Sequence, residues 1–203
     1  MDKKSKFLLL QVNDALFPIG GYSHSYGLET YIQKELVTNA AEAESYIRNK
    51  LTQNLLYNEL FFCRLAWERG QAQDMEGLQE LEEVLEAGKV PSEIREASKK
   101  MGSRFAKTLK NCGIVYETPV FLRYLEKKKN GSVHHVIAYG IFCSSIGISL
   151  EDCLEHFLYA QTSAMVTNCV KSIPLSQTTG QQILVSCTEE MSRLLEQVKE
   201  LPT

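Results

Sequence analysis

Apolar residues recur at every third or fourth position along most of the chain, whereas alternating runs of Val, Ile and Thr are absent. This spacing is typical of helices that bury one face, and it argues against strands. The clearest helix is expected to begin after Thr38, acting as its N-cap, and to end at Gly70. Its inward face should contain Ala43, Ile47, Leu51, Leu55, Phe62 and Leu65.

Two charged helices are predicted after this segment. The first runs from about Ala72 to Glu86 and turns Leu78, Leu81 and Leu85 inward. Its outward residues are acidic: Asp74, Glu76, Glu80, Glu82 and Glu83. Ser92 is expected to cap the second helix, which continues to about Leu109 with an exposed basic side: Lys99, Lys100, Arg104, Lys107 and Lys110. We expect these two helices to lie side by side or to face solvent as charged surfaces.

The second half of the chain contains further start and stop signals. Thr118-Pro119 predicts a short helix that ends in the cations of 127–129. A capping box at Ser149 opens a long helix to about Lys171. Pro174 ends this helix. Two further helices are expected, one that begins at Ser176 and one over 189–201. The pattern predicts an all-α, single-domain bundle of about nine or ten helices over residues 1–203.

Composition narrows the class of protein. The 203 residues are 44% hydrophobic and 23% charged, which is typical of a globular domain rather than a disordered chain. The net charge of −3 provides no global basic field for nucleic acid. The apolar runs at 7–10 and 136–150 are too short for a signal peptide core and a membrane span, respectively. We therefore expect a cytoplasmic protein with neither nucleic acid nor membrane as a partner.

The six cysteines form no C-x-x-C pair and lie mostly in apolar helical patterns. Such thiols pack as small hydrophobic groups, so we expect reduced and mostly buried cysteines. A metal-binding or nucleophilic role for one or two of them remains an alternative. The positions are Cys63, Cys112, Cys143, Cys153, Cys169 and Cys187.

Motifs for catalysis and nucleotide binding are missing from the sequence. There is no P-loop, no dinucleotide-binding glycine pattern, no H-E-x-x-H and no G-x-S-x-G. His134 and His135 cannot point the same way on a helix, because neighbours diverge by about 100°. A metal site could recruit His24 or His135 with a cysteine, although a hydrogen-bonded core histidine is the favoured interpretation.

Three segments depart from ordinary helix patterns. Residues 17–30 read FPIGGYSHSYGLET, with tandem glycines that permit positive φ and close backbone approach. In residues 172–187, Gly180 falls inside a predicted helix, where glycine is unfavourable unless close packing requires it. On the long helix, small residues that suit either a core or a subunit interface lie among large ones: Ala160, Ser163, Ala164 and Thr167.

Four motifs in order resemble the UreF family of urease accessory proteins. Residues 17–29 are similar to the family signature LPxGGFSxSxGLE, with Phe17 for Leu and Tyr22 for Phe. Residues 101–105 match a Met-Gly-x-x-Phe element, and 135–140 match a His-x-x-x-Tyr-Gly element. Residues 173–181 match IPLxQxxGQ. The resemblance extends from about residue 8 to residue 185, which is nearly the whole chain.

The resemblance implies an all-helical, non-catalytic maturation factor. In this family the protein is a dimeric adaptor that joins a UreD/UreH-type protein and the GTPase UreG, positions UreG and gates its GTP cycle. The complex delivers nickel to apo-urease. Nickel would then be the cargo and GTP would be bound by the partner, so no tightly bound cofactor is expected in this chain.

The resemblance also implies site residues. Candidates for partner binding are Tyr22, Ser23 and Glu29 of the N-terminal loop and Tyr159 and Lys171 of the long helix. Candidates for setting the conformation of the loop or the docking segment are Pro18, Gly20, Gly21, Gly27, Gln177, Gly180 and Gln181. Longer members carry a C-terminal tail that orders on the UreD-type partner. This contact is expected to be reduced here, unless the sequence is a truncated form.

Two alternatives to the adaptor remain open at this point. A metallochaperone would hold nickel directly through His24 or His135 together with a cysteine, since nickel accepts imidazole and thiolate ligands. A helical thiol enzyme would need an exposed cysteine of low pKa.

Overall fold

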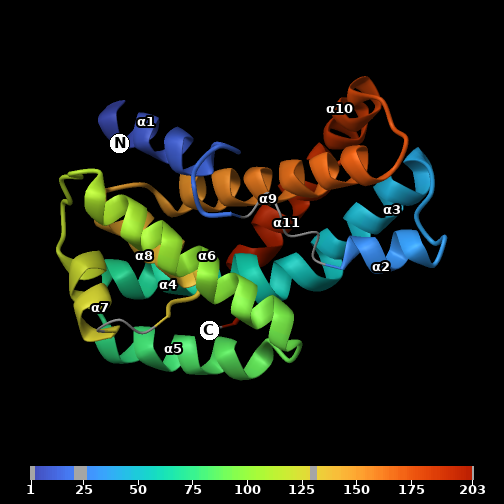
Figure 1. Ribbon diagram of the computed structural model, residues 1–203. Coiled ribbons are helices and arrows are strands. Elements are labelled where there is room, and N and C mark those ends of the chain that lie inside the picture. Colours follow the sequence, from blue (N-terminus) through green and yellow to red (C-terminus); the bar gives the residue numbers. More distant parts are fainter. Residues whose placement is uncertain (1–2, 21–26, 129–131, 203) are drawn as a thin grey trace.

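The computed structural model describes residues 3–20, 27–128 and 132–202, and it contains helices without strands over these residues. The elements are α1 (Lys3–Asn13), α2 (Leu28–Gln33), α3 (Ala40–Lys50), η2 (Leu51–Leu60), α4 (Phe61–Gln71), α5 (Met75–Gly88), α6 (Ser92–Asn111), α7 (Val120–Lys128), α8 (His135–Ser145), α9 (Leu150–Ser172), α10 (Gln177–Ser186) and α11 (Thr188–Glu200). Because α3, η2 and α4 are continuous, the described parts form ten helical rods (Figure 1). The predicted all-α fold is confirmed.

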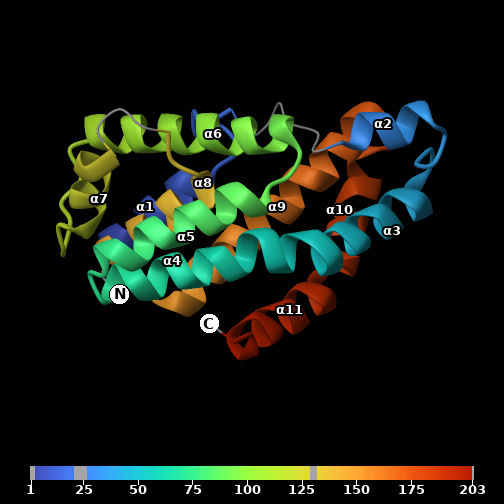
Figure 2. The same ribbon diagram turned by 90° about the horizontal axis from the view of Figure 1, so that it is seen from below.

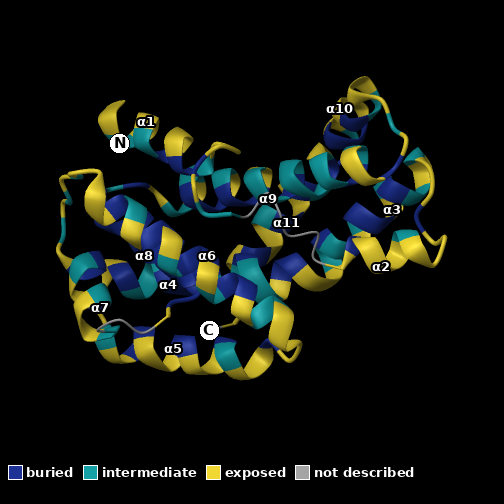
Figure 3. Cartoon of the chain, viewed as in Figure 1, coloured by how far each residue is buried: buried dark blue, intermediate teal, exposed yellow. Residues whose placement is uncertain are grey.

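Helix α8 is a fully buried helix of the bundle. All of its residues are buried (Figure 3), and α4, α6, α7 and α9 pack against it. Helix α4 packs closely against it, because a Cβ on Gly140 would lie only 2.6 Å from the backbone oxygen of Cys63. The apolar stretch at 136–150 is therefore a core helix and its exit turn. Within the described residues, no helix combines the length and apolar character that crossing a membrane requires.

The predicted helix after Thr38 forms, but with two differences. Its N-cap is Asn39, whose side chain accepts a hydrogen bond from the Glu42 N–H, while Thr38 donates to the Glu42 carboxylate. Its middle, η2, is a π-helix, in which the Phe61 N–H donates to Leu56 O five residues earlier. The wider turn rotates the following face, so Phe62 is only half-buried and Cys63 takes an inward position.

The acidic and basic helices, α5 and α6, converge where α5 ends and α6 begins and diverge from there (Figures 1 and 2). Lys99 Nζ of α6 lies 2.9 Å from Glu86 Oε1 of α5. Helix α5 begins at Met75 after an Asp74 cap, rather than at Ala72. The N-cap residue of α6 is Pro91, and no side chain caps this helix end. The prediction that Ser92 caps α6 is therefore wrong.

Glu82 was expected to face solvent, and this prediction is wrong. Its side chain is buried, where Tyr124 donates a hydrogen bond to one carboxylate oxygen. Lys128 Nζ lies 3.3 Å from the other oxygen, and the His134 N–H also donates to the carboxylate. Helix α7 and the segment before α8 thus cover this position of α5 and supply the partners that a buried carboxylate requires.

Helix α9 extends along the molecule, and the last two helices pack against it and turn back beneath (Figures 1 and 2). Its predicted cap is confirmed, since Ser149 Oγ accepts from the Asp152 N–H at 3.1 Å. Ser176 caps α10 in the same way through the Thr179 N–H. Gly180 packs closely against α9, because a Cβ there would lie 2.5 Å from Val170 Cγ2.

Candidate functional site

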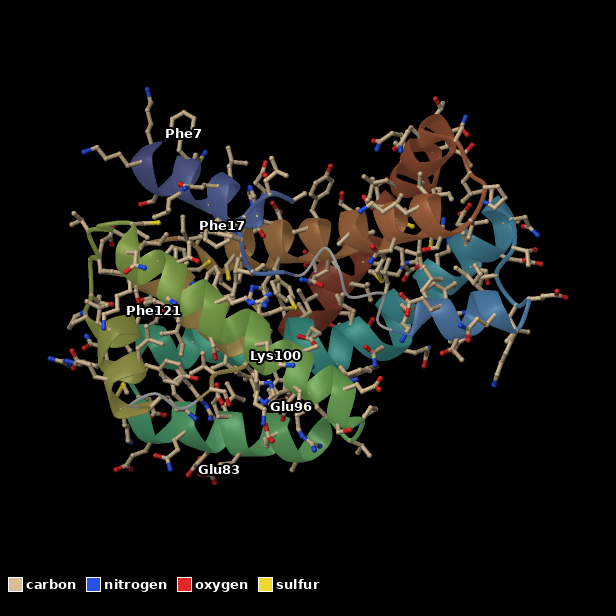
Figure 4. The ribbon with its side chains drawn as sticks, in the orientation of Figure 1. Phe7, Phe17, Glu83, Glu96, Lys100 and Phe121 are labelled. Atoms are coloured by element: carbon tan, nitrogen blue, oxygen red, sulfur yellow. The ribbon has the colours of Figure 1, made fainter. Side chains whose placement is uncertain are left out.

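A tight turn after α1 carries the first described part of the signature segment. The Phe17 N–H donates to Asp14 O, and the Ile19 N–H donates to Phe17 O. Phe17, labelled in Figure 4, is buried. Its ring meets that of Phe105 edge-to-face, with centroids 5.8 Å apart. The ring therefore attaches the turn to α6, while Pro18 beside it is exposed.

Two signature glycines adopt backbone conformations that other residues rarely accept. Gly20 has φ of 78°, and the Arg104 guanidinium occupies the place that its Cβ would take. Gly27 has φ of 92° at the N-cap of α2. Both fit the predicted role in setting the loop conformation. Gly21, Tyr22, Ser23 and His24 lie outside the described residues.

A cavity of about 540 Å³ separates this turn from α9. We call it the N-terminal groove and define it by the residues that line it: Val12–Gly20 apart from Pro18, Met101, His135, Phe157, Tyr159–Gln161, Ser163, Ala164 and Thr167. The small residues of α9 that suited either a core or an interface thus line an open groove. Apolar side chains are exposed to solvent at its rim, where Tyr159 is 55% exposed and Leu16 is 90% exposed.

His135 forms part of the floor of the N-terminal groove. Its ring packs among those of Phe105, Tyr139 and Phe157, and its Nε2 has no hydrogen-bond partner. Burial lowers the pKa of His135 to about 4, with repulsion from Lys89 as a smaller cause. The imidazole is therefore neutral at physiological pH. Across the described chain, no group of three or more His, Cys, Asp or Glu side chains is placed to hold a metal ion.

The neighbouring histidine is also buried but is fully paired. His134 Nδ1 lies 3.0 Å from Ser98 Oγ, and Nε2 lies 2.9 Å from Glu86 Oε2. Burial lowers the pKa of His134, while Glu82 and Glu86 oppose this change. The two adjacent histidines thus have different environments, because His134 is the extended N-cap residue and His135 is the first residue of α8.

The cysteines are free and mostly buried, as expected; Cys112 is exposed. Cys63 Sγ and Cys153 Sγ lie 3.7 Å apart in the core. Burial raises the pKa of both thiols, and it raises that of Cys169 to about 11. These groups lack the thiolate character that a nucleophilic cysteine needs.

The remaining predicted residues divide between two places. Tyr159 shares the N-terminal groove with Gly20, although the two are far apart in the sequence. Lys171 is exposed in the last turn of α9, about 18 Å from Tyr159 along the helix axis. Gln177 and Gln181 are exposed on α10 at that same end, and Glu29 is exposed on α2. Of the described partner-binding candidates, Tyr159 and Lys171 therefore lie at different places along α9.

The sequence did not predict that the residues on the floor of the N-terminal groove lie together. Met101 and His135 lie in two separate family motifs, and only the packing of α6 against α8 brings them to the same cavity. The two motifs themselves were the available signal in the sequence. Their apolar surroundings gave no indication that they border an open surface.

Comparison with known proteins identifies the family. The UreF family model matches residues 37–188. A urease accessory protein UreF from Bacillus sp. (strain TB-90) is 33% identical over 196 residues, covering 96% of this chain and 85% of the relative. The UreF of Corynebacterium glutamicum (strain R) is 32% identical over 193 residues, covering 94% and 83%. That of Haemophilus influenzae (strain PittGG) is 37% identical over 179 residues, covering 87% and 74%. The chain belongs to the UreF family of urease accessory proteins.

Proposed function

We propose that the chain is a non-catalytic adaptor in urease maturation. It joins a UreD/UreH-type protein and the GTPase UreG for GTP-dependent insertion of nickel into apo-urease. In this role it works as a homodimer in the cytoplasm, positions UreG and gates its GTP cycle. Nickel is the cargo of the complex, and the nucleotide belongs to UreG. Membership of the UreF family supports the coarser role in urease maturation.

The observation that carries the adaptor proposal is the N-terminal groove. An open cavity beside the signature turn, with Tyr159 and Leu16 exposed at its rim, is suited to receive apolar side chains of another protein. Tyrosines on such surfaces often contribute most of the binding energy. His135 on the floor of the groove packs among aromatic rings, and across the described residues no group of three or more His, Cys, Asp or Glu side chains is placed to hold a metal ion. The same surroundings give no support to direct nickel binding by His135.

The first experiment measures binding of the purified chain to purified UreG, UreD-type protein and apo-urease. The Tyr159→Ala variant should bind at least one of them about tenfold more weakly, because a half-exposed aromatic anchor is lost. Tyr57→Ala is the matched control, since Tyr57 is 46% exposed on η2 and does not line the groove. Nickel-dependent activation of urease and GTP hydrolysis by UreG should change with Tyr159→Ala as binding does.

Two results would contradict the proposal. A wild-type chain that binds none of the three proteins is not an adaptor among them. Equal weakening by Tyr159→Ala and Tyr57→Ala would remove the N-terminal groove from the interface. Circular dichroism of both variants should match that of the wild type, because neither tyrosine is buried.

A further inference from the structure

A second surface feature lies on the side of the molecule formed by α3 and η2. Lys50, the last residue of α3, lines two hollows at once. One, of about 130 Å³, lies against α9 and the α5–α6 connection; the other, of about 560 Å³, lies against α2. Asn54 also lines both hollows, so they meet beside these two side chains. We call the pair of hollows the Lys50 groove.

Lys50 is a half-buried cation, and the described part of the chain provides it with no counter-ion. Its Nζ lies 5.8 Å from the centroid of the Tyr46 ring, which provides a weak cation–π contact. Among the described residues, no carboxylate lies within ion-pair distance of it. Burial accordingly lowers the pKa of Lys50. An anion placed here would offset the lost hydration of the ammonium group.

The other charged groups of the Lys50 groove are already engaged. Lys89 is buried and pairs with Glu59 through Nζ and Oε1. The Glu42 carboxylate accepts from Thr38 at the start of α3, about 12 Å along the helix from Lys50. Such a distance exceeds the screening length at physiological salt. Lys50 is therefore the charge that remains available to a ligand.

Polar and apolar groups around Lys50 define what kind of anion fits. The smaller hollow presents the amides of Asn54, Asn58 and Gln161, which can donate hydrogen bonds to an oxyanion. The larger hollow has an apolar rim, where Tyr31 is 42% exposed and Leu36 is 57% exposed. One free cation favours a singly charged carboxylate over a phosphate dianion, and a small free anion would leave the apolar rim uncovered.

The backbone at this place is also unusual. Asn54, Asn58 and Glu59 belong to the π-helix η2, a conformation that is rare and frequently occurs at functional sites. Its wider turns carry polar side chains outward beside Lys50 while Leu51, Leu55, Leu56 and Leu60 remain buried. The same segment thus serves both the core and the groove.

We propose that the Lys50 groove binds an aspartate or glutamate side chain of a partner protein, with neighbouring apolar residues of that partner covering Tyr31 and Leu36. The inference rests on the proposed adaptor function and names the chemistry of a second contact, separate from the N-terminal groove. The acidic residue pairs with Lys50, and the amide side chains complete its hydrogen bonds.

The test compares Lys50→Met, Lys50→Arg and Lys107→Met in binding to purified UreG, UreD-type protein and apo-urease. Lys50→Met should weaken one of these complexes about tenfold and reduce its salt dependence, because a partly buried ion pair is lost. Lys50→Arg should retain most of the affinity. Lys107→Met removes an exposed cation of α6 and should leave the affinity within about twofold.

A second measurement does not depend on any variant. With reductively methylated, carbon-13-labelled lysines, NMR follows the pKa of Lys50 before and after the partner is added. A carboxylate beside Nζ should raise this pKa, whereas contact with an apolar surface alone should lower it further. The same NMR measurement with inorganic phosphate in place of the partner shows whether a small anion binds beside Lys50.

Three results would overturn the inference. Unchanged affinities for Lys50→Met with all partners that the wild type binds would exclude Lys50 from the interfaces and leave the adaptor function standing. A Lys50 pKa that partner binding does not raise, or inorganic phosphate that saturates the Lys50 signal without weakening partner binding, would exclude a partner carboxylate. A wild-type chain that binds no partner overturns the adaptor function and this inference together.

Discussion

At the scale of single residues, the adjacent histidines His134 and His135 have different surroundings. His134 hydrogen-bonds through both ring nitrogens, whereas His135 Nε2 is buried without a partner. Burial lowers the pKa of His135 to about 4, well below the ordinary value of 6.5. Folding therefore favours the neutral imidazole of His135, and protonation of this group opposes folding.

The stability of the protein should fall between pH 7 and pH 5 in part because of His135. In this range the unfolded chain binds a proton at His135 that the folded chain excludes, so the free energy of unfolding rises with pH. The contribution of His135 is complete above about pH 6.5 and is lost as the pH falls toward 4. From pH 7 to pH 5 the loss should be about 2 kcal/mol, measured by urea unfolding.

The His135→Gln variant is the control for this prediction. Glutamine does not titrate, so the variant should show a shallower pH dependence by about that amount, whatever its absolute stability. His134 and the carboxylates are common to both proteins and cancel in the comparison. Identical slopes would show that His135 keeps an ordinary pKa in the folded protein.

At the scale of elements, α8 and α4 make a close backbone contact. Gly140 of α8 faces the backbone of α4, where the Cys63 oxygen would lie 2.6 Å and the Ala66 Cβ 2.9 Å from an added Cβ. Such a backbone oxygen cannot rotate away as a side chain can. The distance between these two helices is therefore set by the absence of a side chain at Gly140.

Replacing Gly140 by Ala should destabilise the protein by about 1–3 kcal/mol, because the two helices must separate or strain. Gly88→Ala is the matched control. Gly88 lies at the end of α5, and a Cβ there has open space around it. That change should be neutral or stabilise by up to about 1 kcal/mol. The midpoint and slope of urea unfolding give both values, and equal effects would contradict the close approach.

At the scale of the whole molecule, one side chain joins the last helix to the body. Arg64 of α4 is buried and donates to three carbonyl oxygens at the end of α11. The acceptors are Val198 at 2.7 Å, Lys199 at 2.9 Å and Leu201 at 2.8 Å. Carbonyls at a helix end lack partners within the helix, so the guanidinium satisfies them and complements the helix dipole.

Arg64→Met should loosen α11 while the core around α8 stays folded. The loss of charged hydrogen bonds to carbonyls that remain partly buried should cost about 2–4 kcal/mol. Hydrogen exchange should accelerate in α11 far more than in α8. Arg193→Met on the exposed face of α11 is the control and should cost less than about 0.5 kcal/mol. Uniform acceleration across both helices would mean that Arg64 supports the entire fold.

Local signals in the sequence predicted most of the helices and several of their ends. Ser149 and Ser176 cap their helices as expected, because a cap depends on residues three positions away. The predicted N-cap at Thr38 was wrong by one residue, since the neighbouring Asn39 is an equally good cap and takes this position. The predicted exposure of Glu82 was wrong because α7 and the segment before α8, which lie far along the chain, pack over its side chain.

The candidate site was predicted less completely than the fold. Tyr159 and the turn around Gly20 were both named, and the structure brings them to one groove. Lys171 and Gln181 were also named from the family resemblance, but Lys171 lies in the last turn of α9 and Gln181 on the following helix, α10. Lys50 was not named, although polar residues at every fourth position, Lys50, Asn54 and Asn58, were a visible signal.

The sequence by itself determined the helical class, the approximate helix boundaries and membership of the UreF family. These properties depend on short-range hydrogen bonding, on apolar spacing and on motifs that can be recognised without coordinates. Only the tertiary structure decided that η2 widens into a π-helix, that Glu82 and His135 are buried, and that Lys50 has no counter-ion among the described residues. The physical reason is that burial and charge pairing depend on which distant segments meet, and periodicity along one helix carries no record of its neighbours.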